Sequence, residues 1–216
     1  KWVLMPSGCP VSVMGGRLEF RGCSSGNATK RAVLRAVPQL KPPYAVEFEG
    51  MSTDGGTNGM RRDLGLRWDG VVTGAYNAMA NSMEVSMFDG ARITPDCAGL
   101  GCDSSGQTYI NRIVGGVTAE SICSSEKVLT PGVWRGYKVS DDGMKLSAYW
   151  GDRQLFSAED SFNGGDYIGL SAREYPYGAR AYFDNFRVRP LAAAEPEVYP
   201  YRPSAYAGGG KRVYTR

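Results

Sequence analysis

Short apolar runs, broken about every 8–12 residues by Gly, Pro, Asn and Asp, constrain the fold of this sequence most. The 216-residue chain contains 29 glycines and 12 prolines, as the many tight turns of a β-rich protein require. The spacing of apolar residues that marks an amphipathic helix is hard to find. The sequence therefore predicts an all-β fold, and no internal repeat divides it.

Apolar and polar residues alternate along many of these runs, as they do in a strand that buries one face. The alternation is strong in Tyr44–Glu49. In a later run it places Leu64, Leu66 and Trp68 on one face. The predicted strands are Lys1–Met5, Gly16–Arg21, Lys30–Ala36, Tyr44–Glu49, Asp63–Trp68, Met83–Phe88, Tyr109–Val114, Gly136–Ser140, Lys145–Trp150, Tyr167–Ser171 and Ala179–Arg189. About eleven strands are too many for one open sheet, so we expect two stacked antiparallel sheets.

Two segments add detail to this plan. The sequence Asp141-Asp142-Gly143 contains an Asp-Gly turn signal, which predicts a hairpin between the strands on either side. The segment from Thr94 to Ser125 holds three cysteines and many small residues. We expect it to form a long loop excursion around one strand, tied down by a disulfide.

The composition changes at Leu191. Pro196, Pro200 and Pro203 recur among tyrosines, and three glycines follow at 208–210. This pattern favours an extended, polyproline-like tail, although a disordered linker has the same composition. The predicted organisation is a β-sandwich domain over residues 1–190 and an extended C-terminal tail over residues 191–216.

The chain has no histidine and a net charge of +3. Histidine is the commonest general base and metal ligand, so a serine–histidine triad and a histidine-ligated zinc site are excluded. The small net charge does not call for nucleic acid as a partner. No run of about 18 apolar residues predicts a membrane span. The sequence begins at Lys1, which fits either a removed signal peptide or a fragment of a longer protein.

Five cysteines, none in a Cys-x-x-Cys pair, favour disulfides over a metal site. Disulfides predict an extracellular or cell-surface location. Cys9 could pair with Cys23 across a strand-like stretch, and Cys97 with Cys102 around a small loop, although sequence alone fixes no pairing. Asn27 begins an Asn-Ala-Thr acceptor for N-glycosylation in a loop-like context.

The stretch from Gly136 to Pro190 carries a family resemblance. It contains Tyr167-Ile168-Gly169-Leu170 and the final run Tyr182–Arg189, which reads YFDNFRVR. These resemble the closing strands of concanavalin A-like and laminin G-like domains, especially uncharacterised members in archaeal and bacterial surface proteins. The resemblance implies a two-sheet jelly-roll sandwich, and this fold hosts lectins, glycosidases, adhesins and structural modules.

A glycosidase would need two carboxylates that flank the scissile bond. The glycosidases of this fold carry a compact Glu-x-Asp-x-x-Glu pattern, and this sequence lacks it. Glu47 and Glu49 alternate with apolar residues, so we interpret them as solvent-side side chains. No catalytic residue is predicted. A calcium ion at a loop is the one cofactor that the sequence leaves open, with Asp160, Asn163 and Asp166 as its candidate ligands.

A glycan-binding surface would need exposed aromatic rings. Tyr175 and Tyr177 lie in a loop between the last two strands, and Tyr149 and Trp150 are adjacent, so they point to opposite faces. These four rings are the candidate glycan contacts. Packing of the same rings beneath loops is the alternative.

The leading hypothesis is a non-enzymatic extracellular structural module that assembles into a surface filament, sheath or layer. In this hypothesis the tail contacts a neighbouring subunit and makes a homo-oligomer or polymer. The tail tyrosines that would make this contact are Tyr199, Tyr201, Tyr206 and Tyr214. A carbohydrate-binding or adhesion module is the alternative, and a glycoside hydrolase is the third candidate. Neither nucleic acid nor a membrane is expected as a partner.

Overall fold

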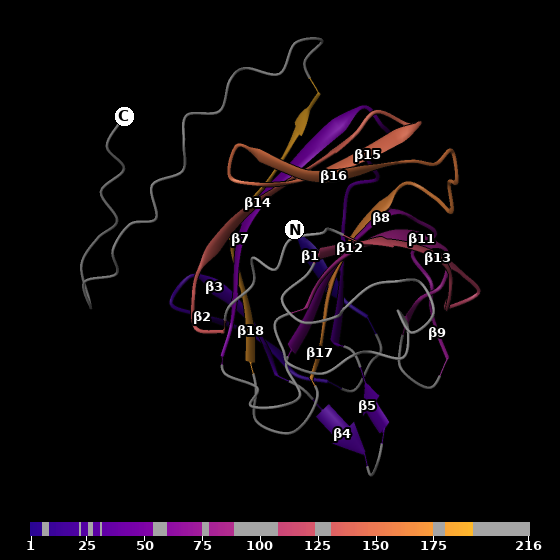
Figure 1. The fold of residues 1–216 in the computed structure, drawn as a ribbon. Helices are drawn as coiled ribbons and strands as arrows, with labels where there is room; N and C mark the ends of the chain where they lie inside the picture. The colour runs from indigo at the N-terminus through magenta and orange to yellow at the C-terminus, as the bar shows by residue number, and fades with distance from the viewer. Residues whose placement is uncertain are drawn as a thin grey trace.

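The protein forms two stacked antiparallel β-sheets of seven strands each (Figure 1). The computed structural model describes residues 1–5, 9–21, 23–25, 28–30, 32–53, 60–74, 78–88, 108–123, 131–174 and 180–191. The described ranges contain strands, turns and bends, and no helix. Within them, accordingly, no helix is long and apolar enough to cross a membrane. The fold is the predicted all-β jelly-roll sandwich.

Each sheet draws its strands from the whole length of the chain. The first, sheet A, has the order β1 (Trp2–Leu4), β6 (Ala32–Ala36), β17 (Tyr167–Glu174), β8 (Met60–Trp68), β11 (Ser82–Phe88), β12 (Thr108–Val114) and β13 (Val117–Cys123). The second, sheet B, has the order β16 (Arg153–Glu159), β15 (Lys145–Trp150), β14 (Arg135–Asp141), β7 (Tyr44–Ser52), β18 (Arg180–Pro190), β3 (Arg17–Arg21) and β2 (Val11–Met14). Two small pairs complete the fold, β4 (Cys23–Ser25) with β5 (Ala28–Lys30) and β9 (Val72–Thr73) with β10 (Ala78–Met79).

The hydrophobic core lies between the two sheets. Tyr44, Val46 and Phe48 of β7 belong to the core cluster and alternate along the strand, as the period of two requires. From sheet A, Leu64 and Leu66 meet them. The ring of Phe48 stacks on that of Tyr137 with centroids 5.3 Å apart, so aromatic packing reinforces the join between neighbouring strands.

All eleven predicted strands are present, with ends that differ by a few residues. The predicted hairpin turn is confirmed, and Gly143 adopts a φ of 97° there, a conformation that favours glycine. Strand β18 is irregular at Asp184 and Asn185. The register of β18 shifts between Asp184 and Arg187, and Asn185 has a φ of 52°.

The prediction that Trp68 shares a face with Leu64 and Leu66 is wrong. Arg67 has a φ of 48°, and the four residues from Gly65 to Trp68 of β8 lie opposite only three residues of β17, from Tyr167 to Gly169. This β-bulge reverses the alternation, so Trp68 leaves the main core. It is fully buried in a second cluster with Val33 and Met79 on the opposite face of sheet A.

The sequence analysis missed several strands, most visibly β2, β13 and β16. The expectation of one strand within the segment 94–125 is wrong, because β12 and β13 form a hairpin there. Its turn contains Gly115 and Gly116, which both have positive φ. Residues 89–107 and 124–130 lie outside the described ranges, and so does the predicted disulfide in that segment.

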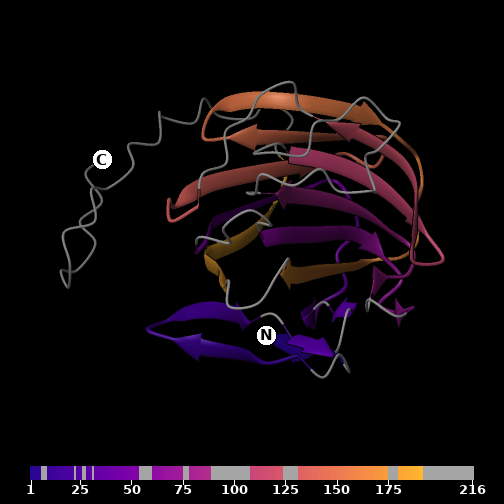
Figure 2. The same cartoon turned by 60° about the horizontal axis from the view of Figure 1, so that its bottom comes forward.

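The last two strands are central rather than peripheral. β17 lies between β6 and β8 in sheet A, and β18 lies between β7 and β3 in sheet B. The first strands, indigo in Figure 2, run along one border of the sandwich, where β1 and β2 are edge strands. β18 ends at Pro190, and the backbone N–H of Leu191 donates to the carbonyl of Pro43. The predicted tail from residue 192 onward lies outside the described ranges.

We expect Leu66→Ala to destabilise the protein by about 2–5 kcal/mol, because Leu66 is fully buried and its loss leaves a cavity. Val13→Ala is the control, because Val13 on edge strand β2 is 71% exposed. Its effect should stay within about 0.5 kcal/mol. Urea unfolding of both variants measures the difference. Equal effects would contradict the described core.

Candidate functional site

The outer face of sheet A, which points away from sheet B, carries a cluster of polar side chains at its centre. These side chains alternate with core residues such as Leu64 and Val85, and they come from five adjacent strands. Strand pairing places Ser171, Asp63 and Ser86 side by side. The members of this buried polar cluster are Arg61, Asp63, Glu84, Ser86, Asn111, Ser121 and Ser171.

Asp63 is the acceptor at the centre of the cluster. Its Oδ1 accepts from Arg61 Nε and from the Ser86 hydroxyl, both at 2.6 Å, and its Oδ2 accepts from the Ser171 hydroxyl at 3.0 Å. Asn111 then links Ser86 on β11 to Ser121 on β13 through two further hydrogen bonds. The network ties five neighbouring strands together across the face of the sheet.

Arg61 bridges the two carboxylates of the cluster. Its Nε donates to Asp63, and its Nη2 donates to Glu84 Oε2 at 3.0 Å. Both carboxylates are completely buried, and the guanidinium compensates the charge of each. A hydrolytic acid–base pair needs one protonated and one ionised carboxyl group facing the substrate. Both carboxylates are enclosed and hydrogen-bonded to the same arginine, so this arrangement suits structure better than hydrolysis.

Next to the polar cluster, the same face of sheet A is covered by β10. Gly65 and Gly169 pair directly across the strands. A Cβ atom on either glycine would overlap the sulfur of Met79. The two glycines thus form a flat floor on which Met79 sits, beside the ring of Trp68. This part of the outer face is therefore packed rather than open.

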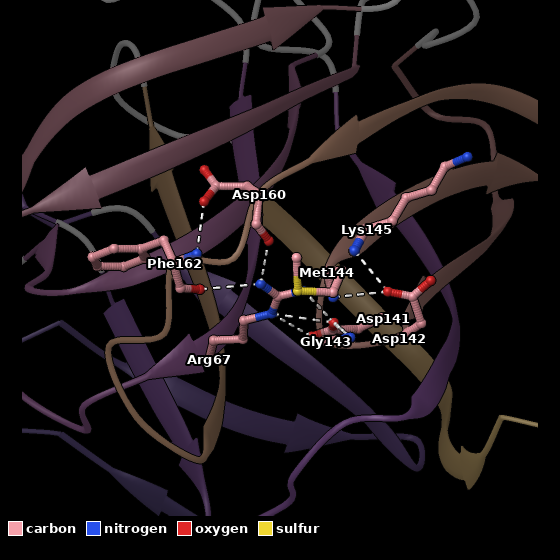
Figure 3. A network of polar contacts seen from close by, with 8 residues as sticks. All are labelled: Arg67, Asp141, Asp142, Gly143, Met144, Lys145, Asp160 and Phe162. Carbon is pink, nitrogen blue, oxygen red and sulfur yellow. Dashed lines mark hydrogen bonds and ion pairs between the residues drawn. The ribbon is translucent and has the colours of Figure 1, made fainter.

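A second buried network joins the two sheets (Figure 3). The bulge at Arg67 aims its guanidinium between the sheets, where Nε and Nη2 donate to the carboxylate of Asp141 on β14. Nη1 donates to the carbonyl oxygens of Asp160 at 2.6 Å and Phe162 at 3.1 Å. Burial lowers the pKa of Arg67, but the hydrogen bonds and charge of Asp141 outweigh it, so the net direction is upward. The guanidinium of Arg67 stays protonated.

Tyr44 packs beside this ion pair. Burial, and secondly the negative charge of Asp141, raise the pKa of the Tyr44 phenol far above its usual value. At the surface next to the pair, the backbone N–H groups of Met144 and Lys145 donate to Asp142. They lower the pKa of that carboxyl group. The turn therefore places one carboxylate in the interior and its neighbour at the surface.

The three predicted calcium ligands serve separate roles. Asp160 Oδ1 accepts from the N–H of Phe162, and Asn163 Oδ1 accepts from the N–H of Gly165. Asp166 lies 3.7 Å from Lys41 Nζ. Among the described residues, no group of three or more His, Cys, Asp or Glu side chains could hold a metal ion. The loop geometry is thus explained by turns and an ion pair, and calcium binding stays a prediction.

Of the four predicted glycan contacts, Tyr149 and Trp150 lie in the described part of the chain. Both are half-buried, and each ring has a cation against it. Lys138 Nζ lies 4.7 Å from the Tyr149 ring centroid, and the guanidinium of Arg135 lies 4.7 Å from that of Trp150. Register confirms that the two rings point to opposite faces, because Tyr149 pairs with Lys138. Tyr175 and Tyr177 fall outside the described ranges.

Cys9 is buried and disulfide-bonded. The N–H of Arg21 donates to the carbonyl of Pro10, so Cys9 lies opposite the residues that follow β3. The side chain of its predicted partner, Cys23, lies outside the described set. The pairing stays a prediction, and Cys97, Cys102, Asn27 and the tail tyrosines Tyr199, Tyr201, Tyr206 and Tyr214 also fall outside the described residues.

The sequence analysis missed the polar cluster and a further aromatic group on sheet B. Trp134 lies with its ring centroid 6.3 Å from that of Tyr182, and the guanidinium of Arg17 lies 4.9 Å from the Trp134 centroid. The alternation of Arg17, Glu19 and Arg21 in the sequence marks one face of a strand. It does not reveal which strands lie beside it.

The sequence matches no protein-family model, and no curated protein matches it. Solved structures share the fold. The carbohydrate-binding module CBM66 from Bacillus subtilis is 15% identical with a TM-score of 0.56, over 87% of this chain and 94% of that one. A protein of unknown function with a galectin-like fold from Bacillus subtilis is 12% identical with a TM-score of 0.62, over 87% and 88%. The Bacillus licheniformis β-glucanase is 11% identical with a TM-score of 0.58, over 88% and 92%. The chain thus has a concanavalin A-like jelly-roll fold.

We expect Asp141→Asn to destabilise the protein by about 3–5 kcal/mol, because it leaves the Arg67 charge buried without its counter-ion. Asp142→Asn is the matched control, because its side chain is exposed and an amide oxygen can still accept from Met144 and Lys145. Chemical denaturation at pH 7 compares the two. A loss in the control as large as in the variant would contradict the role of the ion pair.

A separate prediction concerns Tyr44 and pH. The folded state holds its phenolic proton above pH 10, where the unfolded chain releases it. The folding stability that this group contributes is therefore complete below about pH 10, and each further pH unit removes about 1.4 kcal/mol. Relative to Tyr44→Phe, the unchanged protein should lose stability between pH 10 and 11, measured by urea unfolding. Tyr149→Phe, with a half-exposed ring, is the control. If the stability of the protein and that of Tyr44→Phe change with pH in the same way, the raised pKa of Tyr44 is refuted.

Proposed function

We propose that the protein is a non-catalytic carbohydrate-binding module. The observation that carries this proposal is a set of half-buried aromatic rings at sheet B, each held by a cation. Trp134, Tyr149 and Trp150 each have an arginine or lysine against the ring. A ring fixed in this way offers apolar area with little loss of side-chain freedom on binding, and the neighbouring polar groups suit hydroxyl-rich ligands.

The proposal that the protein lacks hydrolytic activity rests on the two carboxylates of the polar cluster. Asp63 and Glu84 are enclosed, and Arg61 is bound to both. Neither carboxylate is accessible to a ligand on this face in the structure. The half-exposed rings at sheet B need no rearrangement to be reached, so binding there costs less.

Similarity in fold supports the same class of function. One of the similar structures is described as a carbohydrate-binding module, and another as galectin-like. The β-glucanase shows that enzymes also use this fold, so the fold alone does not decide between binding and hydrolysis. The enclosed carboxylates of Asp63 and Glu84, both hydrogen-bonded to Arg61, favour binding over hydrolysis. Assembly through the tail, and a location at the cell surface, remain predictions, because residues 192–216 lie outside the described ranges.

The test is binding of neutral and acidic oligosaccharides by the full chain, on a glycan array and then by titration calorimetry. Tyr149→Ala should weaken binding of a ligand on the outer face of sheet B at least about tenfold, or about 1.4 kcal/mol, whereas Trp150→Ala tests for a ligand on the opposite face. Met144→Ala is the control, because Met144 is 64% exposed at the adjacent turn and should leave affinity unchanged. An assay for released reducing ends should show no hydrolysis.

Two results would contradict the proposal. Hydrolysis that disappears in a folded Glu84→Gln variant would make the outer face of sheet A an active site. If no oligosaccharide in the panel binds, the proposed carbohydrate-binding function is wrong. Binding that survives the ring variants but fails in folded Glu84→Gln would keep the function and move its site to sheet A.

A further inference from the structure

Three arginines converge on the outer face of sheet B, where β3 and β18 pair. Alternation places Arg17, Arg21 and the intervening Glu19 on one face of β3. Register sets Arg180 opposite Arg21 and Tyr182 opposite Glu19. Two parallel columns of side chains result, and both face away from the core.

The guanidinium groups of these columns are accessible, whereas the carboxylates that hold them are not. Arg21 Nε lies 2.6 Å and Arg180 Nη1 lies 3.5 Å from the same oxygen of Glu19. The Arg21 and Arg180 side chains are 47% and 44% exposed, but that of Glu19 is only 2% exposed. Arg17 forms a similar ion pair with Asp184. The side chain of Arg17 is 25% exposed and that of Asp184 is 16% exposed. The carboxylates thus hold the arginines in place, and the guanidinium groups give this surface its positive charge.

Two aromatic rings lie among these arginines. Trp134 and Tyr182 are both half-buried and contact each other, and the guanidinium of Arg17 lies over the Trp134 ring. Arg180 is hydrogen-bonded to Tyr182, which, with the charge of Glu19, raises the pKa of Arg180. We call Arg17, Arg21, Arg180, Trp134 and Tyr182 the arginine patch.

We propose that the arginine patch binds acidic glycans, that is, sugars that carry carboxylate or sulfate groups. A guanidinium matches the two oxygens of a carboxylate or sulfate in geometry and charge. The adjacent rings offer apolar area to the faces of the sugar ring. This inference rests on the proposed carbohydrate-binding function and names its ligand class.

A nucleic acid fits the patch less well. Binding of a phosphate backbone needs a basic stripe that follows many phosphates, and its affinity comes mainly from released counterions. The patch gathers three arginines around two rings, and the whole chain has a net charge of only +3. Its size and composition match one or two acidic sugar residues.

The experiment uses the full chain and four ligands: a heparin-derived oligosaccharide, oligogalacturonate, a neutral cello-oligosaccharide and a single-stranded oligonucleotide. Calorimetry is repeated with the double variant Arg21→Gln/Arg180→Gln and with Trp134→Ala. The matched control is Lys41→Gln/Arg153→Gln, which removes two exposed charges elsewhere. Thermal unfolding confirms that all variants fold.

We expect the acidic oligosaccharides to bind, and the double variant and Trp134→Ala each to weaken them at least about tenfold. The control should change affinity less than about twofold. Binding of a neutral oligosaccharide alone, with equal affinity in all variants, would overturn the arginine patch and leave the proposed function intact. The oligonucleotide could bind as tightly as the acidic oligosaccharides, with no effect of Trp134→Ala. That result would mean that the patch attracts anions in general and does not recognise sugars. Failure to bind any sugar would remove both proposals.

Discussion

The buried ion pair between Arg67 and Asp141 is the interaction on which the arrangement of the two sheets depends. A charged guanidinium between two sheets is stable only when every donor finds a partner, and here one carboxylate and two carbonyls supply them. The bulge that aims Arg67 inward also turns Trp68 outward, onto Met79. One backbone irregularity therefore positions the link between the sheets, the segment at Asp160–Phe162 and the packing of β10.

The periodicity of the sequence predicted the sandwich well, because burial of one strand face leaves a direct trace in the alternation of residue types. It failed at Trp68, since a left-handed arginine carries no signal such as Gly or Asn would give. The short strand β2 escaped recognition because four residues hold too few alternations to identify. The resemblance to concanavalin A-like domains added the sheet arrangement, which alternation alone does not specify.

Candidate site residues were harder to predict than strands, because a site depends on which strands are neighbours. Asp63 and Glu84 look like ordinary solvent-side charges in the sequence, and only the pairing of β8 with β11 brings them to one arginine. The two outer faces then differ in physical character. Sheet A encloses its two carboxylates and the arginine that bridges them, whereas sheet B presents guanidinium groups and rings to solvent above buried carboxylates. The second arrangement is the basis of the proposed ligand site.

The central position of β17 and β18 affects how the chain can be made. Sheet A lacks the strand between β6 and β8 until residue 174 has been synthesised, and sheet B lacks the strand between β7 and β3 until residue 190. Until then, one edge of the β1–β6 pair and one edge of the β2–β3 hairpin have no partner strand. Most of the domain must therefore be synthesised before either sheet is complete, and until then these strand edges are open to wrong pairing.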